Sequence, residues 1–471
     1  MNRFVSGLLF SLVIINSLPA NSQETTEFDE MEFDSLDAGV PVLVTPTRLR
    51  QSKHDIPASV TRIDAEELRA LQIRTIPEAL RYVAGMSVGF ASGNQPRINY
   101  HGTNGLVPRR MQVLVDGMSV YRSGYAEVTW PILPITLQDV WAIEVTRAAS
   151  SPTYGQNSMM AVINIISKDP TQVQDPSIAY RKGGQDTQDM YAQFGDSPSD
   201  SFSYRISIAN ERDEGFDKNF VEEDRHDGSD IDHLNAKANI RISNKTDLNL
   251  FMGFANGITE LEYRDNQQLS FPDIDNSTQY YQADLRHAFS VNHEIKFKTY
   301  YSQIDQKIQW RSCRPQAFFL SSLYELDAQN PNYAATIASG GMPSGGTAAD
   351  DALAFQVFQD ISALGAAAFQ PTCGDVNEDG TESRLDFEVE DTFIASENLR
   401  FVFGAGAAQQ VIDNQTFFNG RKSIWSTRLF GNAEYRFERM VINFGAMVED
   451  ENKNLDHPEI SPRLGLNYRI S

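Results

Sequence analysis

An acidic stretch around Gly380 has the residue types and spacing of a calcium-binding loop. Oxygen-bearing side chains stand at alternate positions before this glycine, and a carboxylate stands at the twelfth position. Such oxygens can converge on one Ca²⁺ while the glycine makes a sharp turn. The twelfth residue is aspartate and not the preferred glutamate, and acidic turn residues with glycine are also common in ordinary loops. This pattern offers a Ca²⁺ site, and the bound ion would order a long loop. The site consists of Asp375, Asn377, Asp379 and Asp386.

The chain has two cysteines, Cys313 and Cys373. In an exported chain a lone pair is most simply one disulfide, and two thiolates cannot build a zinc site unaided. We therefore expect the two residues to be bonded, which would tether the acidic stretch just after Cys373.

The seven histidines are scattered, and none has metalloprotease spacing. No nucleophile elbow and no phosphate-binding loop is present in the sequence. His226 and His233 fall in one long link and could bind a metal or a haem-like ligand, although solvated loop histidines are the commoner case. We therefore expect a protein that is not an enzyme and that requires no cofactor.

A processing signal at the N-terminus indicates export. Arg3 precedes the apolar run Phe4 to Ile15, and Ala20-Asn21-Ser22 offers a cleavage site, so residues 1–22 are expected to be a signal peptide. The run is too short for a membrane span, and a buried N-terminal helix is the alternative. Residues 23–56 follow as a disordered acidic leader with a short extended patch.

The formal net charge of −23 argues against nucleic acid as a partner, because phosphate binding needs a basic surface. No later segment has about 18 consecutive apolar residues, which argues against a membrane-spanning helix. A spanning β-barrel stays open, because its strands alternate apolar and polar residues and are hydrophilic on average.

Residues 57–169 have the pattern of a compact α/β domain. Thr75 to Glu78 has capping-box spacing and predicts the start of a short helix. Asp116-Gly117 between alternating segments predicts a hairpin turn.

From residue 170 to residue 471 the sequence predicts about twelve antiparallel strands with alternating polarity. Short turns and long links alternate between them, which is the layout of a transmembrane barrel and not of a soluble β-sandwich. The predicted strands are 177–183, 187–195, 201–212, 233–243, 246–260, 277–290, 293–311, 384–396, 399–412, 426–438, 440–449 and 459–471.

Residues 40 to 169 resemble the TonB-box and plug region of TonB-dependent receptors in the order and spacing of several motifs. Three departures indicate a divergent subfamily: His101-Gly102 replaces Arg-Gly, Ala148 to Ser151 replaces a Gly-Pro, and Met160-Ala161 replaces Gly-Gly. The later half matches more loosely, best at SPRLGLNY (461–468). The motifs are PVLVTPTR (41–48), IPASVTRIDAEEL (56–68), TIPEALRYVAGMSV (75–88), INYHGTN (98–104), MQVLVDGMSVY (111–121), LQDVWAIEVTRAASSPTYG (137–155) and AVINIIS (161–167).

This resemblance implies a plug domain and a barrel in the bacterial outer membrane, in contact with lipid. Such barrels close with about 22 strands around a plugged lumen, whereas this chain has about twelve. An open sheet edge cannot face lipid, so we expect an N-terminal fragment of a longer barrel. A complete, smaller barrel is the alternative, although a plug of this size would fit poorly inside it.

The resemblance also implies an energy-coupling segment that binds TonB, the inner-membrane energy transducer. An extended segment can add as a strand to a partner's sheet edge through backbone hydrogen bonds, and an ordinary linker is the alternative. The candidate TonB box consists of Val40, Pro41, Val42, Leu43, Val44, Thr45 and Pro46.

Ligand is expected to meet three plug loops, 92–96, 104–110 and 121–127, together with the long barrel links. Arg109 and Arg110 could hold an anionic ligand or pair with acids of the barrel. The candidate ligand-facing residues are Asn94, Gln95, Arg109, Arg110, Tyr121 and Arg122.

The function that follows from the resemblance is active uptake of a scarce nutrient, most often a ferric siderophore. Cobalamin, an oligosaccharide or a peptide is the alternative substrate. A truncated remnant that does not transport and a secreted β-rich enzyme are the remaining alternatives, the second without any catalytic group set.

Overall fold

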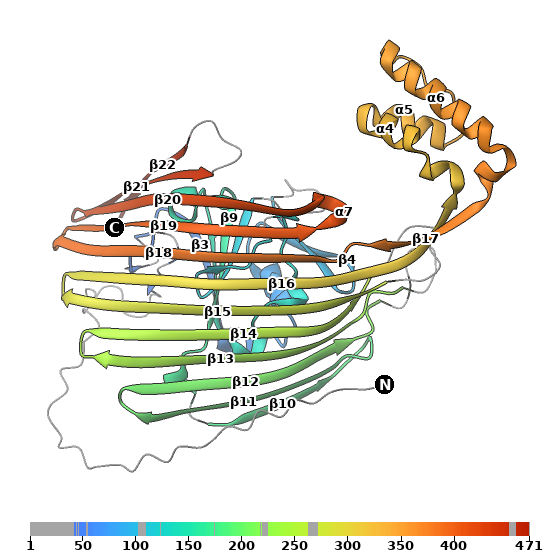
Figure 1. The fold of residues 1–471 in the computed structure, drawn as a ribbon. Coiled ribbons are helices and arrows are strands. Elements are labelled where there is room, and N and C mark those ends of the chain that lie inside the picture. Colours follow the sequence, from blue (N-terminus) through green and yellow to red (C-terminus); the bar gives the residue numbers. More distant parts are fainter. Residues whose placement is uncertain are drawn as a thin grey trace. The chain divides into compact units, whose positions relative to one another are not determined.

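Figure 1 shows the computed structural model of the chain. The chain divides into two compact units, Met1–Pro41 and Val42–Ser471, and the first lies outside the described residues. The predicted signal peptide and most of the predicted leader therefore lie outside them as well. The structure describes residues 42–43, 45, 47–52, 55–101, 110–122, 124–173, 175–216, 218, 225–261, 272–451 and 458–470.

The α/β domain (described residues 42–173) is built on a five-stranded sheet in the order β3-β8-β9-β6-β7. Only the pair β6 and β9 is parallel. The strands β4 and β5 form a separate two-stranded hairpin, and β1 and β2 form another two-stranded sheet. The strands are β1 (Val42–Leu43), β2 (Gln51–Ser52), β3 (Ser59–Asp64), β4 (Met86–Ser92), β5 (Gln95–Tyr100), β6 (Met111–Val115), β7 (Met118–Ser119), β8 (Val140–Arg147) and β9 (Ala161–Ser167).

Short helices connect these strands, and local sequence signals explain where they begin. The predicted capping box is present, because Thr75 and Glu78 bond each other's main chain at the start of α2. The predicted hairpin turn is also present: Asp116 (φ 47°) and Gly117 (φ 78°) are both left-handed, which is the two-residue turn that Asp-Gly favours. The helical segments are α1 (Ala65–Ala70), α2 (Ile76–Ala79), η2 (Leu80–Tyr82), η3 (Trp130–Ile132), η4 (Leu137–Asp139), α3 (Ser151–Tyr154) and η5 (Pro170–Gln172).

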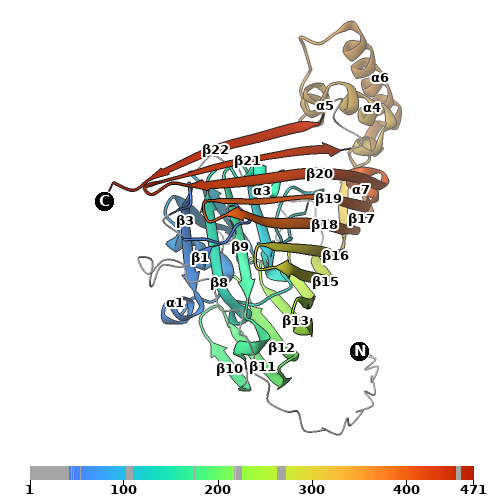
Figure 2. The same cartoon turned by 90° about the vertical axis from the view of Figure 1, so that its left-hand side faces the viewer.

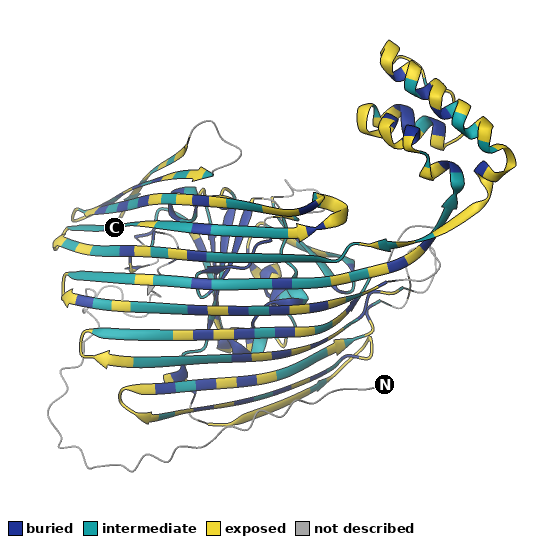
Figure 3. Ribbon diagram, in the orientation of Figure 1, coloured by how far each residue is buried: buried dark blue, intermediate teal, exposed yellow. Residues whose placement is uncertain are grey.

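The rest of the chain carries one antiparallel sheet of thirteen strands, the long sheet, in which consecutive strands pair from β10 to β16 and from β18 to β22, while β16 pairs with both β17 and β18. All twelve predicted strands are present, and the largest shift is at β20, which begins at Gly420 and not at residue 426. Buried and exposed residues alternate along many of them (Figure 3), as period-two side chains require. The strands are β10 (Ser177–Lys182), β11 (Gln188–Ser199), β12 (Phe202–Asp213), β13 (Ser229–Ser243), β14 (Thr246–Glu260), β15 (Asp273–Ser290), β16 (His293–Pro315), β17 (Pro371–Asn377), β18 (Gly380–Ser396), β19 (Leu399–Asn414), β20 (Gly420–Arg436), β21 (Met440–Glu451) and β22 (Glu459–Tyr468).

The predicted alternation of tight and long connections is confirmed. At one end of the long sheet the paired strands close over two residues, as between Ser243 and Thr246 or between Ser290 and His293. The opposite end carries the longer links, among them 214–228 and 316–370. We refer to these as the turn end and the loop end.

The link between β16 and β18 was expected to be a loop, and this expectation was wrong. Residues 316–370 form a helical insert with its own apolar core, in which Leu326 and Val357 are fully buried. β16 continues beyond β18 and pairs with β17, so the insert stands on a two-stranded stalk. The helices of the insert are η6 (Gln316–Phe319), α4 (Ser321–Gln329), α5 (Pro331–Ala338), α6 (Ala348–Leu364) and η7 (Gly365–Phe369).

One helical stretch of this insert, Ala348–Phe369, is long and apolar enough to cross a membrane, judged by length and composition only. From the sequence we expected no such stretch. In the structure α6 packs on α4 and α5 through the core of the insert. A core helix passes the same test, so this stretch is weak evidence for a span.

The α/β domain packs directly on the long sheet, and both views show its strands on one face of that sheet (Figures 1 and 2). Their side chains share one apolar cluster, in which Phe251, Tyr280 and Tyr300 of the long sheet join the core of the domain. The domain is therefore fixed against the sheet by apolar burial as well as by the polar contacts described next.

Candidate functional site

A fully buried arginine joins the α/β domain to the long sheet. Arg205 of β12 is 0% exposed and pairs with Asp139, the last residue of η4. The same carboxylate accepts a hydrogen bond from the hydroxyl of Tyr191 at 2.9 Å, and Arg205 also donates to Asn235 at 2.6 Å. A buried charge is costly without such partners, so this contact fixes the position of the domain against β11 to β13.

The predicted hairpin turn has a second role that the sequence did not indicate. The Asp116 carboxylate accepts hydrogen bonds from the main chain and hydroxyl of Ser167, at 2.9 and 2.5 Å, and from Lys237 of β13 at 3.2 Å. Burial opposes ionisation here, but Lys237 and Ser167 together hold the pKa of Asp116 below its usual range. The turn residue thus links β9 to the long sheet as a carboxylate.

A cavity of about 260 Å³, the Arg122 cavity, lies between the α/β domain and the long sheet. The domain contributes the chain that follows the hairpin turn, and the sheet contributes residues towards the loop end of β18, β19 and β20. The lining combines three cationic side chains with hydroxyls, phenols and aliphatic groups. It includes Ser119, Tyr121, Arg122, Tyr280, Ile304, Glu382, Arg384, Gln410, Ile412, Phe418 and Lys422.

Arg122 connects the two walls of this cavity. Its guanidinium donates to Glu382 of β18 at 3.0 Å and to Gln306 of β16 at 2.8 Å, and it lies 4.4 Å from the ring centroid of Tyr125. The main chain of Arg122 pairs with Glu127, which closes the loop between them. A change in the position of this arginine therefore moves both the loop and its contacts with the sheet.

Tyr125 extends the same loop towards the loop end of the sheet. Its ring packs edge-on against Phe417 and Phe418, with centroid distances of 6.1 and 5.9 Å. Burial raises the pKa of the Tyr125 phenol, with the acid Glu382 acting in the same direction and Arg122 against it. The phenol therefore stays protonated at neutral pH.

A line of alternating charges runs along the long sheet from this cavity. Asp386 pairs with Arg384 at 2.8 Å and with Arg428 at 2.6 Å, and Arg428 also pairs with Glu388 at 2.8 Å. Arg48 of the α/β domain completes the line, because it pairs with Glu388 and, at 3.0 Å, with Glu390. The line thus leads from the Arg122 cavity to the N-terminal end of the domain.

The described part of the candidate TonB box lies next to Arg48. Val42 and Leu43 pair with Ser52 and Gln51, and the buried hydroxyl of Thr45 donates to Glu144 of β8 at 2.5 Å. In this state the main chain of β1 already has a strand partner, and Thr45 is held by the sheet of the domain. Val40, Pro41, Val44 and Pro46 lie outside the described residues.

The structure brings together two of the six predicted ligand-facing residues, Tyr121 and Arg122, in one cavity. Asn94 has a different contact, because its amide donates to the carbonyls of Gly228 and Glu260 on the long sheet, at 2.9 and 2.7 Å. Gln95 accepts a hydrogen bond from Arg97. Arg110 is exposed next to β6, and Arg109 lies outside the described residues.

The four predicted calcium ligands are not brought together. Asp386 lies inside β18, buried between Arg384 and Arg428. Asp379 accepts from the main chain of Ile308 at 2.8 Å, and Asn377 accepts from Asp379. The expected loop is wrong because β18 begins at Gly380, which carries Asp386 away along the strand, and among the described residues no group of three or more His, Cys, Asp or Glu could hold a metal.

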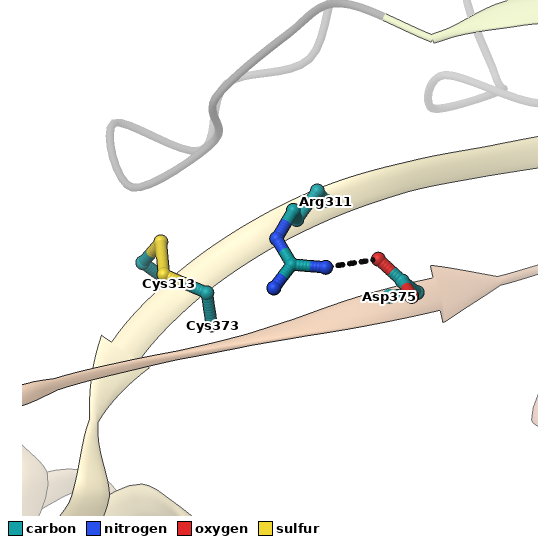
Figure 4. The surroundings of a disulfide bond; sticks show 4 residues. All are labelled: Arg311, Cys313, Cys373 and Asp375. Atoms are coloured by element: carbon teal, nitrogen blue, oxygen red, sulfur yellow. Dashed lines mark hydrogen bonds and ion pairs between the residues drawn. A yellow bond between two sulfur atoms is a disulfide. The ribbon is translucent and has the colours of Figure 1, made fainter.

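The two cysteines are bonded to each other, as the sequence analysis expected. Cys313 of β16 and Cys373 of β17 are register partners in the stalk (Figure 4). Two positions closer to the long sheet, Arg311 and Asp375 form an ion pair across the same strands at 2.9 Å. The disulfide thus closes the base of the helical insert and does not order the acidic turn as a metal loop.

The two histidines that share a predicted link do not share an environment. His226 is exposed, whereas His233 lies inside β13 and is 7% exposed. The loop position considered for His233 was wrong, because His233 lies within β13, which begins at Ser229.

The comparisons with known proteins agree with this architecture. The TonB-dependent Receptor Plug Domain family model matches residues 52–162, which is most of the α/β domain. Vitamin B12 transporter BtuB of Vibrio cholerae is 28% identical over 175 residues, covering 37% of this chain and 28% of the relative. The Ferrichrome outer membrane transporter/phage receptor of Escherichia coli is 25% identical over 180 residues, covering 35% and 22%. The matched part of the chain thus spans less than a third of the length of these curated relatives.

Solved structures extend the likeness to the long sheet. P. aeruginosa FpvA, bound to heterologous pyoverdines, matches with a TM-score of 0.65 at 13% identity, over 93% of this chain and 58% of that one. The siderophore receptor PirA from Acinetobacter baumannii matches with a TM-score of 0.63 at 12% identity, over 89% and 60%. At such identities these likenesses establish the fold alone. Residues 52–162 therefore match a TonB-dependent receptor plug domain, and the chain has the fold of these solved receptors, a small α/β domain on an antiparallel sheet.

Proposed function

We propose that this chain binds a scarce nutrient at the outer surface of a bacterial outer membrane and takes part in its TonB-driven uptake, with a ferric siderophore as the leading substrate. The observation that carries the proposal is the Arg122 cavity, which is lined jointly by the plug domain and the long sheet. A ligand in such a cavity contacts both bodies at once, so its binding changes the contacts that hold the plug.

The lining of the cavity favours a ligand with negative charge and an apolar body. Arg122 and Arg384 supply positive charge as members of ion pairs with Glu382 and Asp386. Lys422 supplies a third positive charge, and Tyr121 and Tyr280 supply aromatic surface. Ligand pockets usually start at about 300 Å³, so a cavity of about 260 Å³ takes one end of a larger molecule. A ferric chelate with acidic groups fits this combination.

Coupling to the inner membrane would use the candidate TonB box. For a strand-addition contact with TonB, Val42 and Leu43 must leave Ser52 and Gln51, and Thr45 must leave Glu144. The charged line from Arg384 to Arg48 joins this segment to the cavity. Ligand binding would promote release of the box by altering that line.

Cobalamin is the second candidate, because vitamin B12 transporters recur among the sequence relatives, at 28% identity in the V. cholerae protein. This match covers 37% of the chain and 28% of the relative, so it does not decide the substrate. The cationic lining is the reason for placing the ferric chelate first.

Binding of a ligand panel to the full-length protein in detergent tests the proposal. The panel contains ferric catecholates, ferric hydroxamates, cyanocobalamin and neutral oligosaccharides. We expect an anionic ferric chelate to bind, Arg122→Gln to weaken it at least tenfold, and deletion of Val40–Pro46 to abolish uptake while leaving binding intact. The matched control is Arg69→Gln, since Arg69 bonds only the carbonyl of Ala65 in its own helix.

Binding of cyanocobalamin alone would transfer the proposal to the second candidate. If no member of the panel bound, or if binding ignored Arg122→Gln, the Arg122 cavity would not be the nutrient site.

A further inference from the structure

A second cavity, the His233 cavity, lies between the plug domain and the first strands of the long sheet. It has a volume of about 290 Å³ and is separate in its lining from the Arg122 cavity. Its walls combine apolar side chains with charged ones, among them Arg74, Arg81, Glu78 and Asp213. The plug domain contributes Ile76, Phe90, Trp130, Ile135 and Leu137, and the long sheet and its loop contribute Phe216 and Ile231.

His233 of β13 lies in this wall with unmet hydrogen-bonding capacity. Its side chain is 5% exposed, and neither ring nitrogen has a hydrogen-bond partner of normal geometry. The ring also interacts with the main-chain carbonyl of Leu133, but not at hydrogen-bond geometry. Buried polar groups in folded proteins are nearly always paired, so an imidazole in this state next to a cavity indicates a missing partner.

Glu211 of β12 lines the same cavity, with its carboxylate 3.8 Å from Nε2 of His233. The nearby guanidinium of Arg74 acts on this acid through its charge. Its hydrogen bonds go instead to Asp189 at 2.9 and 3.0 Å, to Asp213 at 2.7 Å, and to the carbonyl of Arg212. The hydrogen-bonding capacity of the Glu211 carboxylate is therefore not taken up by Arg74.

The spacing of Glu211 and His233 defines the group that would satisfy both. A separation of 3.8 Å is too long for a direct hydrogen bond, but one donor atom about 2.9 Å from each can bridge them. In the neutral tautomer with its hydrogen on Nδ1, Nε2 of His233 is an acceptor like the carboxylate, so the group that bridges them needs at least two donor hydrogens. A hydroxyl has only one, whereas an ammonium has three and also balances the charge of the acid.

We propose that the His233 cavity is a binding site for a small primary amine with an apolar or aromatic body, whose ammonium bridges Glu211 and His233. The body of the ligand lies against Phe90, Trp130 and Ile231. Because the cavity is bounded by both the plug domain and the long sheet, its occupant stabilises their contact. This site is independent of the nutrient site, and Arg122 plays no part in it.

Isothermal titration calorimetry on the full chain in detergent tests this proposal with three matched probes. They are phenethylamine, its neutral analogue 2-phenylethanol and its anionic analogue 3-phenylpropionate. We expect phenethylamine to bind at least tenfold more tightly than the alcohol, and the carboxylate not to bind. Glu211→Gln keeps the volume of the side chain and removes its charge, so it is expected to reduce the amine affinity at least tenfold, as is His233→Leu.

The matched control is Asp232→Asn, because Asp232 is an exposed acid on the same strand, next to His233 but on the opposite face. This variant is expected to leave amine binding unchanged, and so is Arg122→Gln, which separates the two sites. Equal affinity for amine and alcohol, or full amine affinity in Glu211→Gln, would overturn the proposal. Absence of binding by all three probes would also overturn it and leave water as the occupant.

Discussion

The interface between the plug domain and the long sheet and the helical insert are stabilised in opposite ways. The interface joins residues far apart in sequence through buried charges, such as Arg205 with Asp139 and Arg48 with Glu388. The insert closes on itself through a small apolar core above one disulfide. The interface can therefore be damaged from many positions at once, whereas damage to the insert should remain local.

The largest effect is expected from Asp139→Asn. The change leaves the guanidinium of Arg205, which is 0% exposed, without its counter-charge. Removing one partner of a buried pair costs about 3–5 kcal/mol. Thermal unfolding of the protein in detergent should show a lowered midpoint for the whole chain.

The matched control for that experiment is Arg286→Gln. Arg286 pairs with Glu294 but is 45% exposed, so its loss should cost at most about 1 kcal/mol. Equal shifts in the two variants would show that the interface does not depend on its buried pair.

The second prediction concerns the double variant Cys313→Ser with Cys373→Ser. A disulfide of this kind contributes about 2–4 kcal/mol, here to the insert alone, because the loop it closes is the insert and its stalk. Chymotrypsin should cut the insert much faster, since Phe355 and Phe369 are exposed and residues 316–383 contain no Lys or Arg for trypsin. If the unfolding midpoint of the long sheet also fell in the double variant, this would contradict the local character of the insert.

A smaller effect is expected from Thr347→Ala. Thr347 caps α6 by accepting from the main chain of Asp350 at 3.2 Å, and loss of such a cap costs about 1 kcal/mol. Chymotrypsin cleavage of the insert should accelerate moderately, and ligand binding at the plug domain should not change. The control is Thr336→Ala, whose hydroxyl bonds only a carbonyl of its own helix.

The smallest effect is a dependence of the insert on acid. Hydrogen bonds from the Thr347 main chain, Gln329 and Asn330 lower the pKa of Asp350 to about 2. The folded state thus favours the carboxylate, so this contribution is complete above about pH 4 and is lost as the pH falls towards 2. Far-UV circular dichroism should show a loss of helix over that range that Asp350→Asn flattens. If the loss of helix followed the same pH dependence in both proteins, the charge of Asp350 would not be its cause.

The sequence predicted most of the fold because strand alternation, helix capping and turn formation each depend on residues that are close in sequence. Alternation predicted twelve of the thirteen strands of the long sheet, and capping and turn residues predicted α2 and the hairpin at Asp116. The strand β17 and the helical insert were missed, although Thr347 and Asp350 have capping-box spacing at the start of α6. The prediction of Asp386 as a calcium ligand failed because this residue suits both an acidic loop and a strand, and the structure places it in β18.

The candidate site was predicted only in part, and for a different reason. Tyr121 and Arg122 were expected because they lie in an outward loop of a recognisable domain. Their partner Glu382 lies 260 positions from Arg122, and Glu388 lies 340 positions from Arg48, so no local pattern connects them. The environment of His233 was unpredictable for the same reason, because it depends on residues of the plug domain packing against β13.

The length of β16 has a consequence for how far the helical insert stands from the turn end. Its 23 residues, at about 3.3 Å each, extend about 75 Å, more than twice the roughly 30 Å of a bilayer's hydrocarbon core. A strand of this length that crosses such a core from the turn end carries the helices well clear of it, on a stalk that the disulfide closes.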